Sequence, residues 1–212
     1  MKRTMASVTI EDQIDGNELI RKIEAAGRTC YKSEDKIAEG TAEDFIKRII
    51  FSGHESVIEH EKVTVRFVCD RGVSHELVRH RIASFSQEST RYCNYAKDRF
   101  GNEVTVIEPC YWQENEKMKT LWIHAMEDAE RHYFELLDNG ANPQEARSVL
   151  PNSLKTEIVV TMNLREWRHF FKLRTAKRSH PQMREIAIQA LVMFKKIIPI
   201  IFDDIPIPNE SC

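Results

Sequence analysis

The chain has 212 residues, of which 42% are apolar and 30% are charged, as expected for a globular protein with one sizeable core. The formal net charge of −2 excludes a protein that binds nucleic acid by bulk positive charge, so a phosphate site needs a local basic cluster. Apolar runs fall short of the roughly 20 residues of a membrane helix, and we expect neither a membrane span nor a secretory leader.

The first half of the chain predicts short strands and helices in alternation. Alternating apolar and polar residues predict a strand over 8–14, and helically spaced apolar residues predict a helix over 17–26. The segment from Thr41 to Asp44 resembles a capping box and predicts a helix that ends before Gly53. The other elements expected in this half are a strand over 63–69, a short helix over 74–80, a long irregular loop over 82–100 and a short strand over 104–107.

The second half is predicted to be mainly helical. Apolar spacing from Met118 to Leu137 predicts a long amphipathic helix, and Asn142-Pro143 is a strong helix start. A strand over 158–162 is followed by Asn163 as the cap of a helix to about residue 175. His180-Pro181 opens a last helix, which is apolar on nearly all sides over 186–201 and is expected in the core or in a subunit interface.

Together these elements predict an α+β fold, with residues 1–212 forming a single domain. The expected sheet is mixed or antiparallel and is accompanied by long helices. The strands are too few and too irregularly spaced for a doubly wound Rossmann sheet.

The densest group of chemically useful side chains runs from Arg79 to Tyr92. This stretch contains three arginines, one histidine and three serines, and most of it is predicted to be loop. Arginine forks suit phosphate oxygens, and hydroxyls and loop amides can complete a nucleotide site. The alternative is a solvated basic loop without a specific ligand.

Other common sites have no support in the sequence. The seven glycines form neither a G-x-G-x-x-G fingerprint nor a Walker loop, so a dinucleotide would not be bound in the Rossmann manner. His54 and His60 have a poor spacing for a helical zinc pair, and we expect no metal. The five cysteines are scattered, without a Cys-x-x-Cys pair, and predict free thiols and a reducing, cytoplasmic location.

Four ordered segments resemble the flavin-dependent thymidylate synthases. The most specific is Arg79-His80-Arg81 followed after seven residues by Ser89, which is that family's signature pattern. The other three are His54-Glu55-Ser56-Val57-Ile58-Glu59-His60, Ala146-Arg147-x-x-Leu150-Pro151, and Asn163-Leu164-Arg165-Glu166 with His169 and Leu173-Arg174. The similarity covers roughly residues 25–195.

The resemblance implies reductive methylation of dUMP to dTMP. The carbon donor would be 5,10-methylenetetrahydrofolate, FAD would transfer the hydride, and NADPH would reduce the FAD. No cysteine lies in the signature, which is compatible with a reaction that uses no protein nucleophile. By resemblance Arg174 is the catalytic cation that activates the pyrimidine. The alternative for Arg174 is a surface arginine that offsets the negative end of a helix dipole.

The resemblance also implies two sets of binding residues. Those expected to bind dUMP are Glu76, Arg79, Gln87, Glu88, Ser89, Thr90, Arg91, Arg147 and Arg174. Those expected to bind FAD are His54, Ser56, Arg79, His80, Arg81, Gln87, Asn163, Arg165 and His169. Two positions depart from the family pattern, because Glu76 stands where relatives often carry Gln and Gln87 where many carry Glu.

Several of these roles have structural alternatives. Asn163 can serve as a helix cap without any ligand, and His169 can be a half-buried helix histidine. Arg165 and Arg174 are nine residues apart, on opposite faces of a continuous helix. This separation favours active sites shared between subunits, and the family resemblance implies a homotetramer.

Two other classes of function compete with this hypothesis. A nucleic-acid-binding module that uses the stretch 79–99 is disfavoured by the net charge and by the few aromatic residues in the loop. A non-catalytic flavin or nucleotide sensor with the same fold is disfavoured because Ser89, Arg147 and Arg174 occur together. The sequence alone does not identify the residues that contact folate or NADPH.

Overall fold

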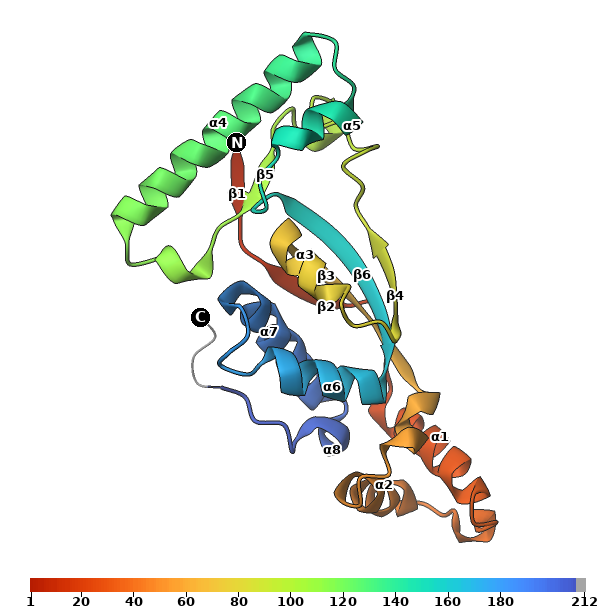
Figure 1. Ribbon diagram of the computed structural model, residues 1–212. Coiled ribbons are helices and arrows are strands. Elements are labelled where there is room, and N and C mark those ends of the chain that lie inside the picture. The colour runs from red at the N-terminus through yellow and green to blue at the C-terminus, as the bar shows by residue number, and fades with distance from the viewer. Residues whose placement is uncertain (209–212) are drawn as a thin grey trace.

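The centre of the computed structural model, which describes residues 1–208, is a four-stranded antiparallel sheet (Figure 1). Its strand order is β2-β3-β6-β4, and a separate two-stranded parallel sheet joins β1 to β5. The strands are β1 (Lys2–Thr4), β2 (Ser7–Ile10), β3 (Lys62–Asp70), β4 (Ala83–Gln87), β5 (Thr105–Ile107) and β6 (Lys155–Asn163). The α+β class and the non-Rossmann sheet are therefore confirmed.

Helices cover one face of this sheet and extend the molecule at both ends. The helices are α1 (Gly16–Thr29), α2 (Thr41–Phe51), α3 (Arg71–Leu77), α4 (Glu116–Asp138), α5 (Pro143–Ala146), α6 (Leu164–Arg174), α7 (Pro181–Ile197) and α8 (Pro199–Phe202). Short 3₁₀ helices are η1 (Glu34–Lys36), η2 (Glu55–His60), η3 (Asp98–Phe100), η4 (Cys110–Trp112) and η5 (Arg147–Val149). In Figure 1, α4 and α5 lie at one end and α1 and α2 at the other. No helix among these residues is long and apolar enough to cross a membrane.

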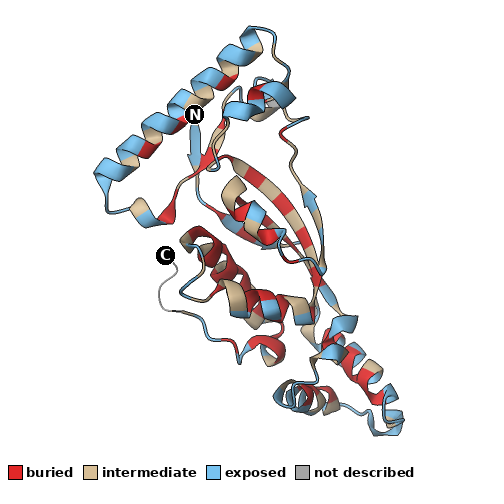
Figure 2. Ribbon diagram, viewed as in Figure 1, coloured by how far each residue is buried: buried red, intermediate tan, exposed pale blue. Residues whose placement is uncertain are grey.

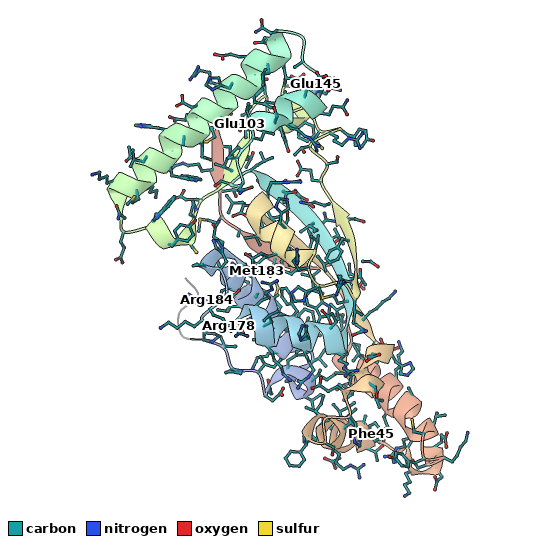
Figure 3. The ribbon with its side chains drawn as sticks, viewed as in Figure 1. Phe45, Glu103, Glu145, Arg178, Met183 and Arg184 are labelled. Atoms are coloured by element: carbon teal, nitrogen blue, oxygen red, sulfur yellow. The ribbon has the colours of Figure 1, made fainter. Side chains whose placement is uncertain are left out.

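The main core lies between the sheet and helices α3, α6 and α7, and it continues among α1, α2 and α8. Strands β3 and β6 alternate buried and half-buried residues, so every second side chain enters this core (Figure 2). Trp167 of α6 is fully buried, and its indole N–H donates to the Val63 carbonyl over 3.0 Å, which joins α6 to β3. Met183 of α7, labelled in Figure 3, is also fully buried. Ile186, Leu191 and Phe194 are buried as well, so the expectation that the apolar stretch 186–201 enters the core is confirmed.

A second, smaller core lies beneath α4. It comprises Tyr95, Val104, Val106, Trp122, Met126, Tyr133, Ala146 and Leu154. At the opposite end of the molecule α1 packs on α2 at Gly27, where a Cβ atom would lie 2.5 Å from the Phe45 ring. A side chain at residue 27 would therefore push the two helices apart.

Two local predictions are wrong, and one strand pairing was not predicted. The predicted loop over 82–100 contains β4, a half-exposed edge strand without β-branched residues, which forms because it pairs with β6. Thr41 caps no helix, because Gly40 is the N-cap residue at φ 82° and the Thr41 hydroxyl bonds Ala38 and Glu24 instead. The parallel pairing of β1 with β5 had no signal in the alternation pattern.

The cysteine prediction is only partly confirmed. Cys30, Cys69 and Cys93 form no disulfide, whereas Cys110 is disulfide-bonded. Burial raises the pKa of the Cys69 thiol, so this residue is an inert part of the core. Cys212 lies outside the described residues.

Candidate functional site

Arg174 ends α6 and points toward the C-terminal end of α3. Its Nη1 donates to the Glu76 carboxylate over 2.7 Å, and its Nη2 donates to the Glu76 backbone carbonyl over 3.1 Å. Its Nε donates to His80 Nε2 over 3.0 Å. The side chain is only 15% exposed, so Arg174 belongs to a partly buried network and is not a solvated arginine at a helix end.

His80 lies between Arg174 and Glu166. The His80 Nδ1 atom is 3.1 Å from a carboxylate oxygen of Glu166, and the residue is only 4% exposed. Burial is the largest cause that lowers the pKa of His80, and the Arg174 guanidinium lowers it further, whereas Glu166 acts in the opposite direction. Both ring nitrogens are bonded within the protein, and the predicted contact of His80 with FAD stays a prediction.

The side chains around His80 could also be considered as a metal site. Donor atoms of His80, Glu166 and His169 lie within 4.8 Å of one another. Because a guanidinium already occupies the second ring nitrogen of His80, a cation on the first would face a charge of the same sign. The contacts are better explained as a hydrogen-bonded chain from Glu166 through His80 to Arg174.

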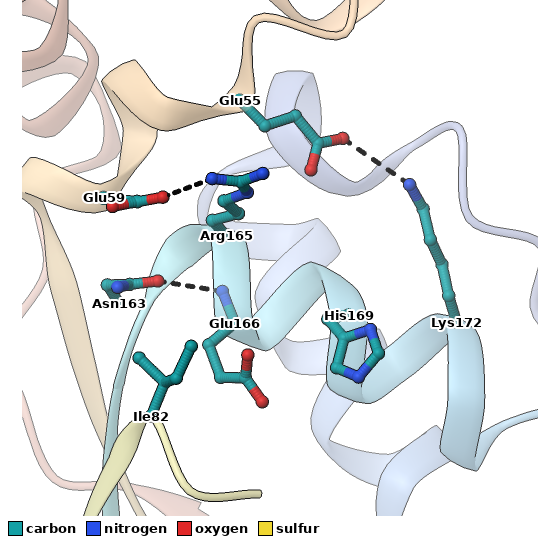
Figure 4. A pocket seen from close by; sticks show the side chains of 8 residues that line it. All are labelled: Glu55, Glu59, Ile82, Asn163, Arg165, Glu166, His169 and Lys172. Atoms are coloured by element: carbon teal, nitrogen blue, oxygen red, sulfur yellow. Dashed lines mark hydrogen bonds and ion pairs between the residues drawn. The ribbon is translucent and has the colours of Figure 1, made fainter.

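A pocket of about 550 Å³ opens beside this chain, along one face of α6 (Figure 4). Its lining residues are Glu55, Glu59, Ile82, Asn163, Arg165, Glu166, His169 and Lys172. They include three of the residues predicted to bind FAD, namely Asn163, Arg165 and His169. An amide, two cations and an apolar edge suit part of a dinucleotide that carries a diphosphate.

The pocket has three carboxylates, Glu55, Glu59 and Glu166, and its two cations are already paired within the protein. Arg165 pairs with Glu59 over 2.5 Å, and Lys172 pairs with Glu55 over 3.5 Å. The Asn163 side chain accepts from the backbone N–H of Glu166 over 2.8 Å, so its capping role is confirmed. A diphosphate would compete with the two glutamates for these cations, and Asn163 would still have its amide NH₂ group available.

A second, basic pocket of about 500 Å³ lies between α3 and the segment that contains α5 and η5. Its lining residues are Arg71, His75, Thr90, Gln144, Arg147, Ser148, Leu150, Pro151, Asn152 and Leu154, and no carboxylate is among them. Arg147 donates to the Thr90 hydroxyl over 3.2 Å, and Arg71 donates to the Glu88 carbonyl over 3.4 Å. The pocket therefore joins two residues predicted to bind dUMP, Thr90 and Arg147, and it suits an anion.

Gln87 and Glu88 use their side chains to hold the loop that carries Thr90. The Gln87 amide donates to the hydroxyls of Ser74 (2.9 Å) and Thr156 (3.2 Å). Glu88 accepts from the Tyr95 hydroxyl over 3.0 Å and pairs with Lys155 over 3.1 Å. These contacts give both residues a positioning role, and their predicted contacts with ligands stay predictions.

The end of the signature segment forms an exposed turn. Ser89 Oγ accepts from the backbone N–H of Arg91 over 3.3 Å, which is a contact typical of a turn and not of an activated nucleophile. Arg91 lies over the ring of Tyr92 at 5.4 Å, and Tyr92 is 74% exposed.

The remaining predicted flavin residues are dispersed. Arg79 and Arg81 are exposed in the turn that follows α3, because that helix ends at Leu77 and not at residue 80 as predicted. Ser56 is exposed on η2. His54 lines a different pocket of about 400 Å³, between α1 and α2, together with three basic residues, Arg28, Lys36 and Arg48.

Four residues of these sites were not predicted from the sequence. Glu166 was named only within the segment Asn163-Leu164-Arg165-Glu166 and was given no role, although its place three residues after Asn163 and on the same helix face as His169 was visible. Arg71 and His75 lie four residues apart, a helical spacing that sets them on one face of α3. Lys172 had no distinguishing signal.

Comparisons with known proteins agree on one family. Residues 14–200 match the family model described as thymidylate synthase complementing protein. A flavin-dependent thymidylate synthase of Geobacter sulfurreducens is 38% identical over 186 residues, covering 84% of this chain and 78% of that protein. The corresponding protein of Pyrococcus furiosus is 37% identical over 166 residues, covering 78% and 67%.

Solved structures with a similar fold include a nucleotide methylase. It is the UMP/dUMP methylase PolB of Streptomyces cacaoi, determined with 5-Br dUMP bound, and it superimposes with a TM-score of 0.80 over 96% of both chains. At 24% sequence identity this likeness supports the fold alone.

Proposed function

The chain belongs to the flavin-dependent thymidylate synthase family, and we propose that it converts dUMP to dTMP with 5,10-methylenetetrahydrofolate as the carbon donor. Bound FAD would supply the hydride that completes the methyl group, with NADPH as its source and tetrahydrofolate as the released product. The observation that carries this proposal is the constrained guanidinium of Arg174 beside the signature segment.

Arg174 is proposed to activate the pyrimidine. A guanidinium has five N–H donors, and the contacts with Glu76 and His80 use three of them among the described residues. The two that remain, one on Nη1 and one on Nη2, can donate to an oxygen or a deprotonated nitrogen at the edge of uracil. Stabilising negative charge there pushes electron density toward carbon 5, so no protein nucleophile is needed.

The basic pocket of Arg147 is proposed to bind the phosphate of dUMP. A phosphate dianion needs several N–H and O–H donors, and Arg147, Thr90 and the turn after Ser89 provide them. Ser89 contributes a hydrogen bond and not a covalent bond, because its observed partner is a backbone amide. The other residues proposed to contact dUMP are Glu76, Arg79, Gln87, Glu88 and Arg91.

The pocket on α6 is proposed to hold FAD. Arg165 and Lys172 would meet the diphosphate, Asn163 would donate its amide, and His169 would line the same wall. His54, Ser56, Arg79, His80, Arg81 and Gln87 complete the proposed flavin set. The chemistry that FAD supplies when bound is hydride transfer, which the side chains of this protein cannot provide.

We propose that these sites are completed in a homotetramer. Arg147 and Thr90 contact each other on one side of α3, whereas Arg174 is bonded to Glu76 and His80 at its far end. His54 likewise lines a pocket separate from that of Asn163. This dispersion supports active sites assembled from more than one subunit, and light scattering of the purified protein tests it. The cytoplasmic location and the lack of a metal stay predictions.

The activity is tested by release of the carbon-5 hydrogen from labelled dUMP, with FAD, NADPH and methylenetetrahydrofolate present. Wild-type protein should release it, and Arg174→Ala should abolish release while retaining the fold. A folded, flavin-loaded wild-type protein that gives no release would leave the sensor hypothesis as the better one. Near-normal turnover of Arg174→Ala would remove Arg174 from its proposed role.

A further inference from the structure

We propose that Glu166, acting through His80, positions the guanidinium of Arg174 for the reaction. The inference rests on the proposed function for the role of Arg174, but the hydrogen-bond chain itself can be tested without turnover. Glu166 is assigned no contact with dUMP or FAD, and the role inferred here for His80, in addition to its proposed place in the flavin set, is to position Arg174.

The geometry requires one tautomer of His80. Arg174 Nε carries a hydrogen and can only donate, so the His80 Nε2 atom at 3.0 Å must be an unprotonated acceptor. In a neutral ring the single hydrogen then lies on Nδ1, where the Glu166 carboxylate accepts it at 3.1 Å. Glu166 thereby selects the tautomer that can hold Arg174.

The hydrogen bonds to His80 and Glu76 also fix the direction of the Arg174 guanidinium. His80 holds Nε, while the Glu76 carboxylate and carbonyl hold one hydrogen each of Nη1 and Nη2. A planar group bonded at three nitrogens has little rotational freedom, and its two remaining N–H groups point in fixed directions. With Nε2–H on His80, two donors would face each other and Arg174 would turn away.

The charges around His80 explain how protonation of its imidazole would break the hydrogen bond to Arg174. Glu166 and His169 face it from α6, Arg174 faces it from the end of that helix, and the Phe170 ring packs at 5.0 Å. Glu76 of α3 lies beyond Arg174, and Arg79 and Arg81 flank His80 in sequence. An imidazolium would present an N–H to the guanidinium, so activity should fall at acid pH as His80 is protonated.

The decisive variants are Glu166→Gln and Glu166→Asp, with Glu185→Gln as a matched control. Glu185 is a half-buried glutamate of α7 whose carboxyl group has a raised pKa through burial, and no ligand role is assigned to it. Flavin content, kcat, KM for dUMP and the pH profile of kcat are measured for each. The tautomer is read directly from nitrogen chemical shifts of ¹⁵N-histidine-labelled protein, with His80→Phe assigning the signal.

Wild-type protein should show the Nδ1–H form of His80. In Glu166→Gln kcat should fall by about 10- to 100-fold, as for other residues that orient a functional group, with little change in KM. The acid limb of its profile should move to lower pH, because the carboxylate that favours the imidazolium is gone. Glu166→Asp, which keeps the charge, should retain more kcat, and Glu185→Gln should match wild type.

Two results would overturn the proposal. One is a wild-type His80 found as Nε2–H or as imidazolium at neutral pH. This measurement uses wild-type protein only, so it tests the proposal even if Glu166→Gln fails to fold. The other is a Glu166→Gln enzyme with unchanged kcat and an unmoved acid limb. A wild-type protein with the Nδ1–H tautomer but no carbon-5 release would refute the proposed function and leave the hydrogen-bond chain intact.

Discussion

Arg168 offers the most direct test of what holds the wall of the pocket on α6 together. Its side chain is 2% exposed, and its guanidinium forms a fork with the Asp204 carboxylate at 2.6 and 2.7 Å. It also donates to Glu55 over 3.0 Å and to the carbonyl of Ile201. One buried cation thus joins α6 to η2, on which the pocket depends, and to the segment that follows α8.

Replacing Arg168 by Met keeps much of the volume and removes the charge. Breaking a buried charge network by removing one partner costs about 3–5 kcal/mol, mainly because the other charges stay desolvated. Asp204 is 47% exposed and Glu55 is 20% exposed, so both carboxylates can regain water and the low end applies. We therefore expect a loss of about 3 kcal/mol, or a Tm lower by about 6–12 °C for a chain of this size.

The assay is urea denaturation at neutral pH and fixed protein concentration, followed by tryptophan fluorescence. The hydrogen bond from Arg168 lowers the pKa of Asp204 below 3.8. The stabilisation of the fold by the Arg168–Asp204 pair is therefore fully present above about pH 4, and it is lost as the pH falls through the lowered pKa of Asp204 in the folded state. The difference in free energy of unfolding between wild type and Arg168→Met should therefore become smaller below pH 4. A neutral-pH difference under about 1 kcal/mol would refute this account of the network.

Three further predictions concern the proposed ligand sites. Arg147→Ala should weaken dUMP binding by about 10- to 100-fold, the value of one or two charge-assisted hydrogen bonds, and calorimetry that shows unchanged affinity would remove Arg147 from the phosphate site. Ser89→Ala should raise KM for dUMP without total loss of activity, whereas complete inactivity with intact nucleotide binding would reopen the nucleophile hypothesis. Asn163→Ala should lower the free energy of unfolding by about 1 kcal/mol through loss of the helix cap, whereas Asn163→Asp should retain the cap. If both variants bind FAD like wild type, Asn163 is only a cap.

Much of the fold could be predicted because its signals are local. The alternation in β3 and β6 and the cap at Asn163 depend on neighbouring residues, and their positions are confirmed within a few residues. Strand β4 and the pairing of β1 with β5 depend on partners far along the chain, which periodicity does not report. The Thr41 capping pattern failed because a tertiary partner, Glu24, competes for the hydroxyl.

For the candidate site, resemblance supplied residue identities but not their partners. The pairing of Thr90 with Arg147 and of Arg174 with Glu76 spans 57 and 98 residues of sequence, respectively. Glu166 was missed for the same reason, since its partner His80 is 86 residues away and only the fold brings them together. The Gln87 amide donates to Ser74 and Thr156, which lie 13 and 69 residues away in the sequence, so these contacts could not be predicted either.

Strand β6 connects the two candidate sites through one continuous piece of backbone. It begins at Lys155, which holds Glu88 near the basic pocket, and ends at Asn163 beside the pocket on α6. A slip of one residue against β3 would exchange the faces of all its side chains. An insertion or deletion within this strand would therefore disturb both sites at once, and natural or engineered length changes should be confined to segments such as 31–40, where most residues are exposed.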